Sequence, residues 1–180
     1  MAHPTKILDS LLVLSFQRGD KKALTLLFKR WNKKICVQAF RYTNDWDLAQ
    51  DVTQDTWRTV LGKIHMLRDA NKFGSWVMTI ANRKALDYLK SNKKYIKFSY
   101  HQELDDSCSD IYETVSKEDK INSVLIALKA LPLEQRIVLQ LFYLEEYSMK
   151  DISKITGVTV NTVKTRLFRA REKLKLLIKK

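Results

Sequence analysis

Residues 148–167 read SMKDISKITGVTVNTVKTRL, and this stretch decides the fold of the C-terminal part of the chain. Ser148 followed three residues later by Asp151 is a capping pattern that starts a helix. Gly157 supplies a left-handed turn position, and Thr159 is a residue type that caps the helix after it. We therefore predict a short helix, a turn and a second helix, with the length and central glycine of a helix-turn-helix motif.

The second predicted helix, from Thr159 to Lys173, has two chemically different faces. Apolar residues at spacings of three and four form an inward stripe: Val160, Val163, Leu167, Ala170, Leu174 and Leu177. The helix also carries the candidate nucleic-acid contacts: Thr159, Asn161, Thr162, Lys164, Thr165, Arg166, Phe168, Arg169 and Arg171.

Lys164, Thr165, Phe168 and Arg169 form one contiguous patch, because they lie one helical turn apart in pairs. An Arg or Lys in such a patch reaches a guanine edge or a phosphate, and an exposed aromatic ring meets a thymine methyl group or a sugar. The alternative is an amphipathic terminal helix that packs on its own domain or ends a coiled coil.

The 180-residue chain has a formal net charge of +13, from 33 Lys and Arg against 20 Asp and Glu. An excess of this size indicates a polyanionic partner, because neutralising phosphates releases counterions and strengthens binding. A soluble basic protein without such a partner is the alternative.

Composition argues against several other classes of protein. Cys36, Cys108 and the three histidines are scattered, so we expect neither a metal site nor a disulfide scaffold, and no cofactor. The longest N-terminal apolar run, residues 11–16, is too short for a signal peptide or a membrane span. We therefore predict a cytoplasmic protein with no membrane insertion.

The rest of the chain also has helical periodicity. Its four Gly and two Pro provide little material for tight turns and hairpins. We predict helices over residues 23–42, about 45–64 and 75–94, with a loop at 65–74. Their expected buried faces are Leu24, Leu27, Phe28, Trp31, Ile35 and Ala39; Leu48, Val52, Trp57, Val60, Leu61 and Ile64; and Trp76, Val77, Ile80, Ala81, Ala85 and Leu89.

Periodicity is lost between the two helical parts. Residues 101–119 contain seven Asp or Glu and one Lys, a composition that buries too little apolar surface to offset its ordering entropy. We predict an all-α fold of two small helical domains, residues 1–97 and 120–180, joined by an acidic linker, residues 98–119, with the helix-turn-helix in the second domain.

Several phrases resemble the extracytoplasmic-function (ECF) class of RNA polymerase sigma factors. VKTRLFRAREKL at 163–174 and LPLEQR at 131–136 resemble the C-terminal sigma domain. LLFKRW at 26–31, DVTQDTW at 51–57 and FGSWVMTIANRKALDYL at 73–89 resemble the N-terminal domain in order and spacing. The resemblance covers residues 24–97 and 121–177, and the chain has no additional domain between the two halves.

The resemblance implies roles for particular residues. The helix with Asp47, Asp51, Gln54 and Asp55 is expected to dock on the clamp helices of the largest subunit of core RNA polymerase. Trp57 is assigned to the core. Phe73 and Trp76 could be base-stacking platforms, but the resemblance favours the core, because Trp76 matches a position that the family usually buries. A loop and the helix after it are expected to bind the downstream, minus-ten promoter element, through Arg68, Asn71, Lys72, Asn82, Arg83 and Lys90.

The resemblance also implies partners. The helix-turn-helix is expected to bind the upstream, minus-thirty-five element of promoter DNA. The acidic linker is expected to cross the active-site and RNA-exit region of the polymerase, where its charge would mimic RNA. Factors of this class are usually held by an anti-sigma factor, although no residue of this chain identifies one.

The leading hypothesis is a sigma factor that directs promoter-specific initiation and catalyses nothing itself. The main alternative is a helix-turn-helix transcriptional regulator that does not depend on core polymerase, but such a protein requires a receiver or sensor domain, which the N-terminal half does not resemble. A nucleic-acid enzyme is the third class. It would have to use Asp51 and Asp55, which lack further acidic or histidine partners.

Overall fold

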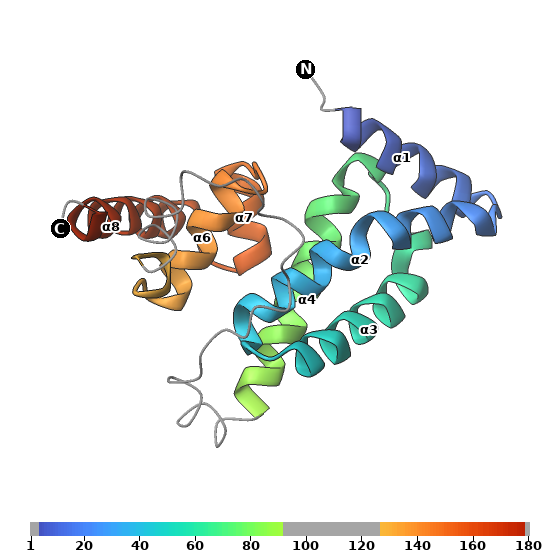
Figure 1. Ribbon diagram of the computed structural model, residues 1–180. Helices are drawn as coiled ribbons and strands as arrows, with labels where there is room; N and C mark the ends of the chain where they lie inside the picture. Colours follow the sequence, from blue (N-terminus) through green and yellow to red (C-terminus); the bar gives the residue numbers. More distant parts are fainter. Residues whose placement is uncertain (1–3, 92–126, 179–180) are drawn as a thin grey trace, which may run out of the picture. The chain divides into compact units, whose positions relative to one another are not determined.

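The computed structural model describes residues 4–91 and 127–178, and over these residues it contains helices and turns with no strand (Figure 1). Contacts between Cα atoms divide the chain into two compact units, one built from α1–α4 and the other containing α6 and α8. The all-α prediction is confirmed. The predicted acidic linker, residues 98–119, and both domain boundaries lie outside the described residues.

In the N-terminal unit, four helices are joined by short turns. They are α1 (Pro4–Gln17), α2 (Lys21–Thr43), α3 (Trp46–Lys63) and α4 (Phe73–Ser91), with the 3-10 turns η1 (Ile64–Met66) and η2 (Ala70–Lys72) between α3 and α4. The long helix α2 packs against α1, α3 and α4 (Figure 1). Its position makes it the common support of the unit.

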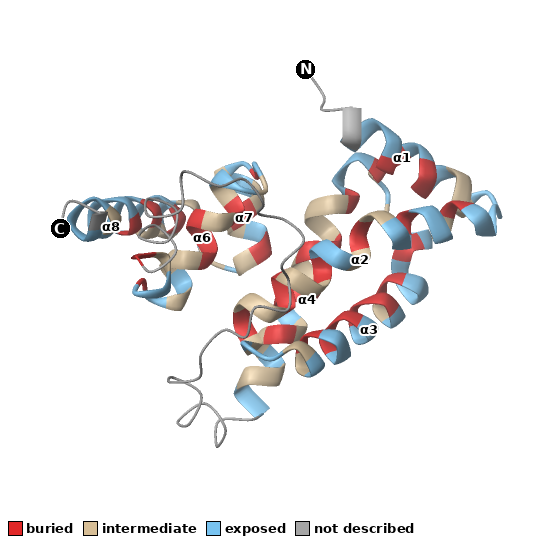
Figure 2. Cartoon of the chain, in the orientation of Figure 1, coloured by how far each residue is buried: buried red, intermediate tan, exposed pale blue. Residues whose placement is uncertain are grey.

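The predicted apolar faces form most of this core. α2 buries Leu27, Trp31, Ile35 and Ala39, α3 buries Val52, Trp57 and Val60, and α4 buries Phe73, Val77, Ala81 and Ala85 (Figure 2). The predicted burial is wrong for two residues, because Phe28 is 44% exposed and Leu61 is 46% exposed. Both lie at the border of their stripe, where Phe28 still contacts the Trp57 ring at a centroid distance of 5.0 Å.

Side chains next to the helix ends cap them as the sequence pattern indicates. The Asp45 carboxylate accepts hydrogen bonds from the backbone N–H groups of Asp47 at 2.9 Å and Leu48 at 3.1 Å. Asn44 before it adopts a left-handed conformation, with φ of 52°, which ends α2. Turn chemistry at these two residues therefore separates α2 from α3.

The connection between α3 and α4 differs from the predicted loop at 65–74. Two 3-10 turns occupy most of it, and α4 begins at Phe73 rather than at Ser75. Burial explains the difference, because Ile64, Ala70 and Phe73 all lie in the core and fold the connection onto the helices. The connection is therefore short and anchored at both ends.

Residues 127–178 contain the helices α6 (Leu133–Tyr143), α7 (Met149–Thr156) and α8 (Val160–Ile178). Ser148 Oγ accepts from the Asp151 backbone N–H at 3.2 Å, and Thr159 Oγ1 accepts from the Thr162 backbone N–H at 3.1 Å. Gly157 has a φ of 73° and makes the turn between α7 and α8. The helix-turn-helix prediction is confirmed with its caps.

The inward stripe of α8 is buried in its middle and not at its end. Val163, Leu167 and Ala170 are fully buried, whereas Leu177 is 37% exposed. Helix α8 packs against α6. At 1.5 Å per residue α6 is about 16 Å long and α8 about 28 Å, so the last turns of α8 extend beyond the length that α6 covers.

None of the helices in residues 4–91 and 127–178 combines the length and the apolar character needed to cross a membrane.

Leu27→Ala should lower the free energy of unfolding of the N-terminal unit by about 2–5 kcal/mol, because it leaves a cavity at a residue that is fully buried. Leu26→Ala is the matched control, since Leu26 is 49% exposed. Urea unfolding followed by tryptophan fluorescence measures this unit, because Trp31, Trp46, Trp57 and Trp76 are the only tryptophans in the chain. Equal losses in the two variants would contradict the assigned core.

Candidate nucleic-acid interface

Helix α8 is exposed over much of its length (Figure 2), and its exposed positions include polar and basic residues. Lys164, Thr165, Phe168 and Arg169 are all exposed, with Phe168 at 63%. The Thr165 hydroxyl donates to the Asn161 carbonyl at 3.0 Å, and its oxygen can still accept a hydrogen bond. This four-residue patch, called the α8 patch below, thus combines two cations, a hydroxyl and an exposed aromatic ring.

The turn before α8 holds the helix start in place through short-range bonds. Ser153 Oγ donates to the Val158 carbonyl at 2.6 Å across the Gly157 turn. The hydroxyls of Thr159 and Thr162 lie 2.9 Å apart, so both belong to the N-terminal cap. Of the predicted contacts on α8, these two therefore have a structural role already, and Ser153 is a supporting residue that sequence reasoning missed.

Two arginines predicted to contact nucleic acid face α6 instead. Arg166 forms an ion pair with Glu134, and its side chain is only 22% exposed. The Arg171 guanidinium lies over the rings of Phe142 and Tyr143, at 5.7 Å and 5.4 Å from their centroids. We therefore correct the prediction for Arg166, which fastens α8 to α6; Arg171 is exposed but stacks on the same helix.

The connection between α3 and α4 exposes Arg68, Asn71 and Lys72. Asp69 organises this segment, because its carboxylate accepts from the Asn71 backbone N–H at 3.1 Å and pairs with Lys72 Nζ at 2.7 Å. The hydrogen bond from Lys72 is the main cause that holds the pKa of Asp69 below its ordinary value; the Asn71 backbone N–H acts in the same direction, and desolvation opposes both. Sequence reasoning missed Asp69.

Helix α4 presents Arg83 and Lys90 on its exposed side. Asn82 does not lie there: its side-chain oxygen accepts hydrogen bonds from the Tyr42 hydroxyl and from Gln38 Nε2, the latter at 3.4 Å, both on α2. The prediction that Asn82 faces nucleic acid is corrected, since its amide holds α4 on α2. Asn82 and Arg83 are adjacent in sequence, and the helix turns them to different faces.

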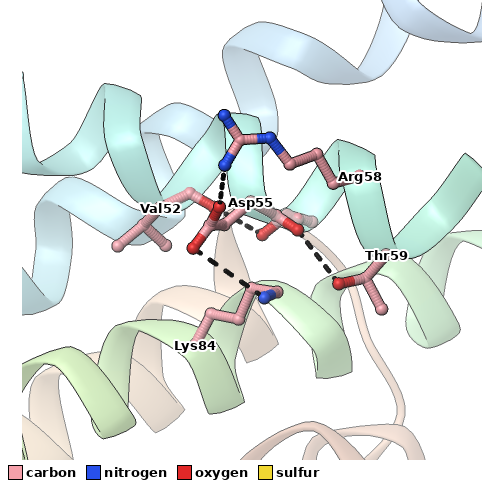
Figure 3. Close-up of polar contacts among 6 residues, drawn as sticks. Val52, Asp55, Arg58, Thr59 and Lys84 are labelled. Atoms are coloured by element: carbon pink, nitrogen blue, oxygen red, sulfur yellow. Dashed lines mark hydrogen bonds and ion pairs between the residues drawn. The ribbon is translucent and has the colours of Figure 1, made fainter.

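The acidic edge of α3 is formed by Asp47, Asp51, Gln54 and Asp55, which are all exposed and lie opposite the buried Val52 and Val60. In Figure 3, Asp55 lies between Arg58 of α3, at 2.6 Å, and Lys84 of α4, at 4.0 Å. Neither Asp47 nor Asp51 has an ion-pair partner among residues 4–91 and 127–178. These two carboxylates therefore carry the uncompensated charge of the edge.

Sequence reasoning also missed Gln17, which holds the connection between α3 and α4. Its side-chain nitrogen donates to the carbonyls of Ile64 at 2.8 Å and Leu67 at 3.0 Å. No short-range pattern signals this role, because the partners lie 47 and 50 residues away. A local signal for Asp69 does exist in the sequence, since an Asp two residues before Asn71 is an ordinary capping arrangement.

Two family models match the chain. The model described as Sigma-70 region 2 matches residues 27–95, and the model described as Sigma-70, region 4 matches residues 121–174. The first match includes the acidic edge of α3 and the connection to α4, and the second includes the helix-turn-helix. The two groups of candidate residues thus fall in two different matched regions.

Curated relatives resemble the chain over most of its length. RNA polymerase sigma factor SigV of Bacillus subtilis is 31% identical over 144 residues, covering 79% of this chain and 82% of SigV. The ECF RNA polymerase sigma-E factor of Haemophilus influenzae is 30% identical over 179 residues, covering 93% of each chain.

A solved structure shares the fold. It is the sigma factor RpoE in complex with the anti-sigma factor NepR, from Bartonella quintana, with a TM-score of 0.64 at 20% identity, covering 88% of this chain and 98% of that chain.

The Lys72→Met variant should bring the pKa of Asp69 up towards its ordinary value, because it removes the hydrogen bond that contributes most to the lowered pKa. In the native chain the ionised carboxylate stabilises η2 above the ordinary pKa of an aspartic acid, and this stabilisation is lost as the pH falls through the lowered pKa. Carboxyl carbon NMR titration of Asp69 measures both values. The same titration of Lys90→Met is the control, and equal pKa values in all three proteins would contradict the assignment.

Proposed function

Because this chain belongs to the ECF class of RNA polymerase sigma factors, we propose that three separate surfaces divide its work at the promoter. The function itself follows from the family: the protein is a sigma factor that directs transcription initiation by RNA polymerase. The observation that carries this conclusion is the presence of region 2 and region 4 in one chain. A regulator that acts without polymerase would have no use for region 2.

The α8 patch is proposed to read the upstream promoter element. Arg169 and Lys164 have the donors for guanine edges or phosphates, and Phe168 offers an apolar face to a thymine methyl group or a sugar. Support comes from the exposure of all four patch residues and from the caps that hold the helix start. Arg166 and Arg171 have a positioning part in this proposal, because they fasten α8 to α6.

The connection between α3 and α4, together with the exposed side of α4, is proposed to bind the downstream element. Arg68 and Arg83 supply cations for phosphates, and the Asn71 amide has donors and an acceptor for a base edge. Lys90 extends the basic surface along α4. Lys72 contributes less in this proposal, because its ammonium group is already paired with Asp69.

The acidic edge of α3 is proposed to dock on basic residues of the clamp helices in the largest polymerase subunit. Asp47 and Asp51 carry the attraction, while Asp55 shares its charge with Arg58 and Lys84. Gln54, between Asp51 and Asp55 in the sequence, adds an amide to the edge. An edge of this kind speeds association and sets orientation more than it adds affinity.

An anti-sigma factor is proposed as the regulatory partner, by analogy with the RpoE–NepR complex, whose sigma factor has this fold. The protein is proposed to act in the cytoplasm without catalysing a reaction itself.

The acidic segment at 98–119 is proposed to mimic RNA charge in the polymerase. Reversing the linker charges should change core affinity and the release of abortive transcripts, and unchanged values would exclude the mimicry.

The function is tested with core polymerase, with and without the protein, transcribing a library of promoter fragments. Specific initiation that appears only with the protein is the expected result. DNA binding with an inactive core enzyme would instead identify a regulator. The fragments that initiate also define the promoter sequence for the experiments below.

Arg169→Ala should cost about 1–3 kcal/mol of promoter binding and relax sequence preference at one position of the upstream element, if the guanidinium reads a base edge. Holoenzyme binding to a panel of single-base promoter variants measures both effects. Lys173→Ala is the control, because Lys173 is exposed on α8 outside the patch and is expected to weaken all sequences equally. Uniform weakening by Arg169→Ala as well would restrict Arg169 to phosphate.

Asp51→Asn should weaken binding to core polymerase on the order of tenfold, about 1.4 kcal/mol, because it removes a charge that forms no ion pair within residues 4–91 and 127–178. Asp87→Asn, an exposed carboxylate on α4, should leave the affinity unchanged. Binding is measured without DNA at two salt concentrations, and the difference between the variants should shrink at the higher one. A loss that persists at high salt would point to a structural defect instead.

A further inference from the structure

Helix α1 has apolar residues on two opposite faces. One face packs inside the N-terminal unit, where Val13 is fully buried. The other face carries four aliphatic side chains that are between 42% and 56% exposed: Ile7, Leu8, Leu11 and Leu14. A helix that is apolar all round is normally buried all round. Four neighbouring exposed aliphatic side chains on one helix therefore indicate a surface that a partner covers.

The exposed set, called the α1 face below, has the geometry of a seam for another helix. Ile7, Leu11 and Leu14 are spaced by four and three residues, which is the repeat of the core positions in a coiled coil. Leu8 lies one turn before Leu11 and widens the seam at its start. Helix α1 is about 21 Å long, which matches about two heptads of a partner helix. A seam this narrow fits a helix better than a bilayer surface, which calls for a broader apolar face.

Basic residues stand at both ends of the α1 face. Lys6 precedes it, and three exposed cations follow it: Arg18, Lys21 and Lys22. The Arg18 backbone N–H donates to the Leu14 carbonyl at 3.1 Å, so Arg18 lies one helical turn beyond Leu14. A partner with acidic side chains beside its apolar stripe would meet opposite charges at both ends of the seam.

Two acidic residues lie between Lys6 and Lys22, and they leave this stretch basic. The Asp9 carboxylate is buried and pairs with Arg30 of α2 at 2.8 Å. The Asp20 carboxylate caps α2 by accepting from the Lys22 backbone N–H at 2.9 Å. A second copy of the chain is a poor occupant, because its own α1 face has the same cations at its ends and like charges would meet in either helix orientation.

We propose that the α1 face binds an amphipathic helix of another protein, one that has an aliphatic stripe with acidic residues beside it. This surface is separate from the promoter and polymerase surfaces described above, and the inference rests on none of them. Helix α1 precedes residues 27–95, the part of the chain that the region 2 model matches. Burial of the four aliphatic side chains supplies the affinity, and the flanking charges select the partner.

The first test uses the full-length chain and a synthetic peptide. The peptide has about three heptads, with Leu at the core positions and Glu at the flanking positions, where like charges keep it from pairing with itself. Fluorescence anisotropy of the labelled peptide should show binding, and a peptide with Lys in place of every Glu should bind about tenfold more weakly or less. Equal binding of the two peptides, or no binding of the Glu peptide, would overturn the proposal.

Substitutions within the α1 face locate the contact. Leu11→Gln and Leu14→Gln should each weaken binding of the Glu peptide about tenfold, because each removes an aliphatic side chain from the seam. Leu61→Gln is the matched control, since Leu61 is similarly exposed but lies on α3. Urea unfolding of the variants separates a lost contact from a lost fold. Equal weakening in all three variants would refute the assignment to the α1 face.

A second pair of variants tests the charges. Arg18→Gln combined with Lys22→Gln should weaken binding of the Glu peptide about fivefold at low salt and reduce its salt dependence. Lys150→Gln combined with Lys154→Gln removes the same charge from exposed positions on α7 and should change neither. The same effect in both double variants would mean that net charge alone attracts the peptide, and the proposed flanking contacts would be refuted.

Other occupants of the α1 face give different results, and each of these results would overturn the proposal. A dimer in analytical ultracentrifugation that Leu11→Gln dissociates would assign the face to a second copy of the chain. Binding to vesicles of phosphatidylcholine and phosphatidylglycerol that Leu11→Gln abolishes would assign it to a lipid surface. Loss of promoter-specific transcription in Leu11→Gln would assign it to the polymerase. A monomer that ignores vesicles and transcribes at the native level is the expected result.

Discussion

Burial of one stripe of α2 is the constraint on which the rest of the N-terminal unit depends. Leu27, Trp31, Ile35 and Ala39 are fully or almost fully buried, and α1, α3 and α4 all pack on this helix. That packing decides which sides of α3 and α4 remain outside. The acidic edge of one and the basic side of the other are the faces left over once the apolar stripes have been buried.

Charged and polar groups in this protein serve both packing and recognition. Arg166 pairs with Glu134, Arg30 pairs with Asp9, and the Asn82 amide joins α4 to α2. The 33 Lys and Arg residues are therefore not all available to a polyanion. Lys164 and Arg169 on α8 and Arg68 between α3 and α4 are among the cations that remain exposed.

Local chemistry made the helices, their turns and their caps predictable from the sequence. Helix type, the Asn44–Asp45 break, the Gly157 turn and the Thr159 cap depend on residues within about four positions of one another, so the sequence displays them directly. Exposure of Phe168 followed from the same periodicity. Errors arose at the margins of the stripes, at Phe28 and Leu61, where one helical position separates buried from exposed.

By itself the sequence determined the all-helical class, the helix-turn-helix and the family, because these rest on periodicity, caps and motif order. Only the tertiary structure decided that Arg166 and Asn82 face inward and that Gln17 grips the carbonyls of Ile64 and Leu67. Their partners lie more than 30 residues away in the chain, and no local pattern encodes such a pairing. The fold brings these groups together because apolar burial sets the helix positions first, and the polar groups then bond to whichever partners lie within reach.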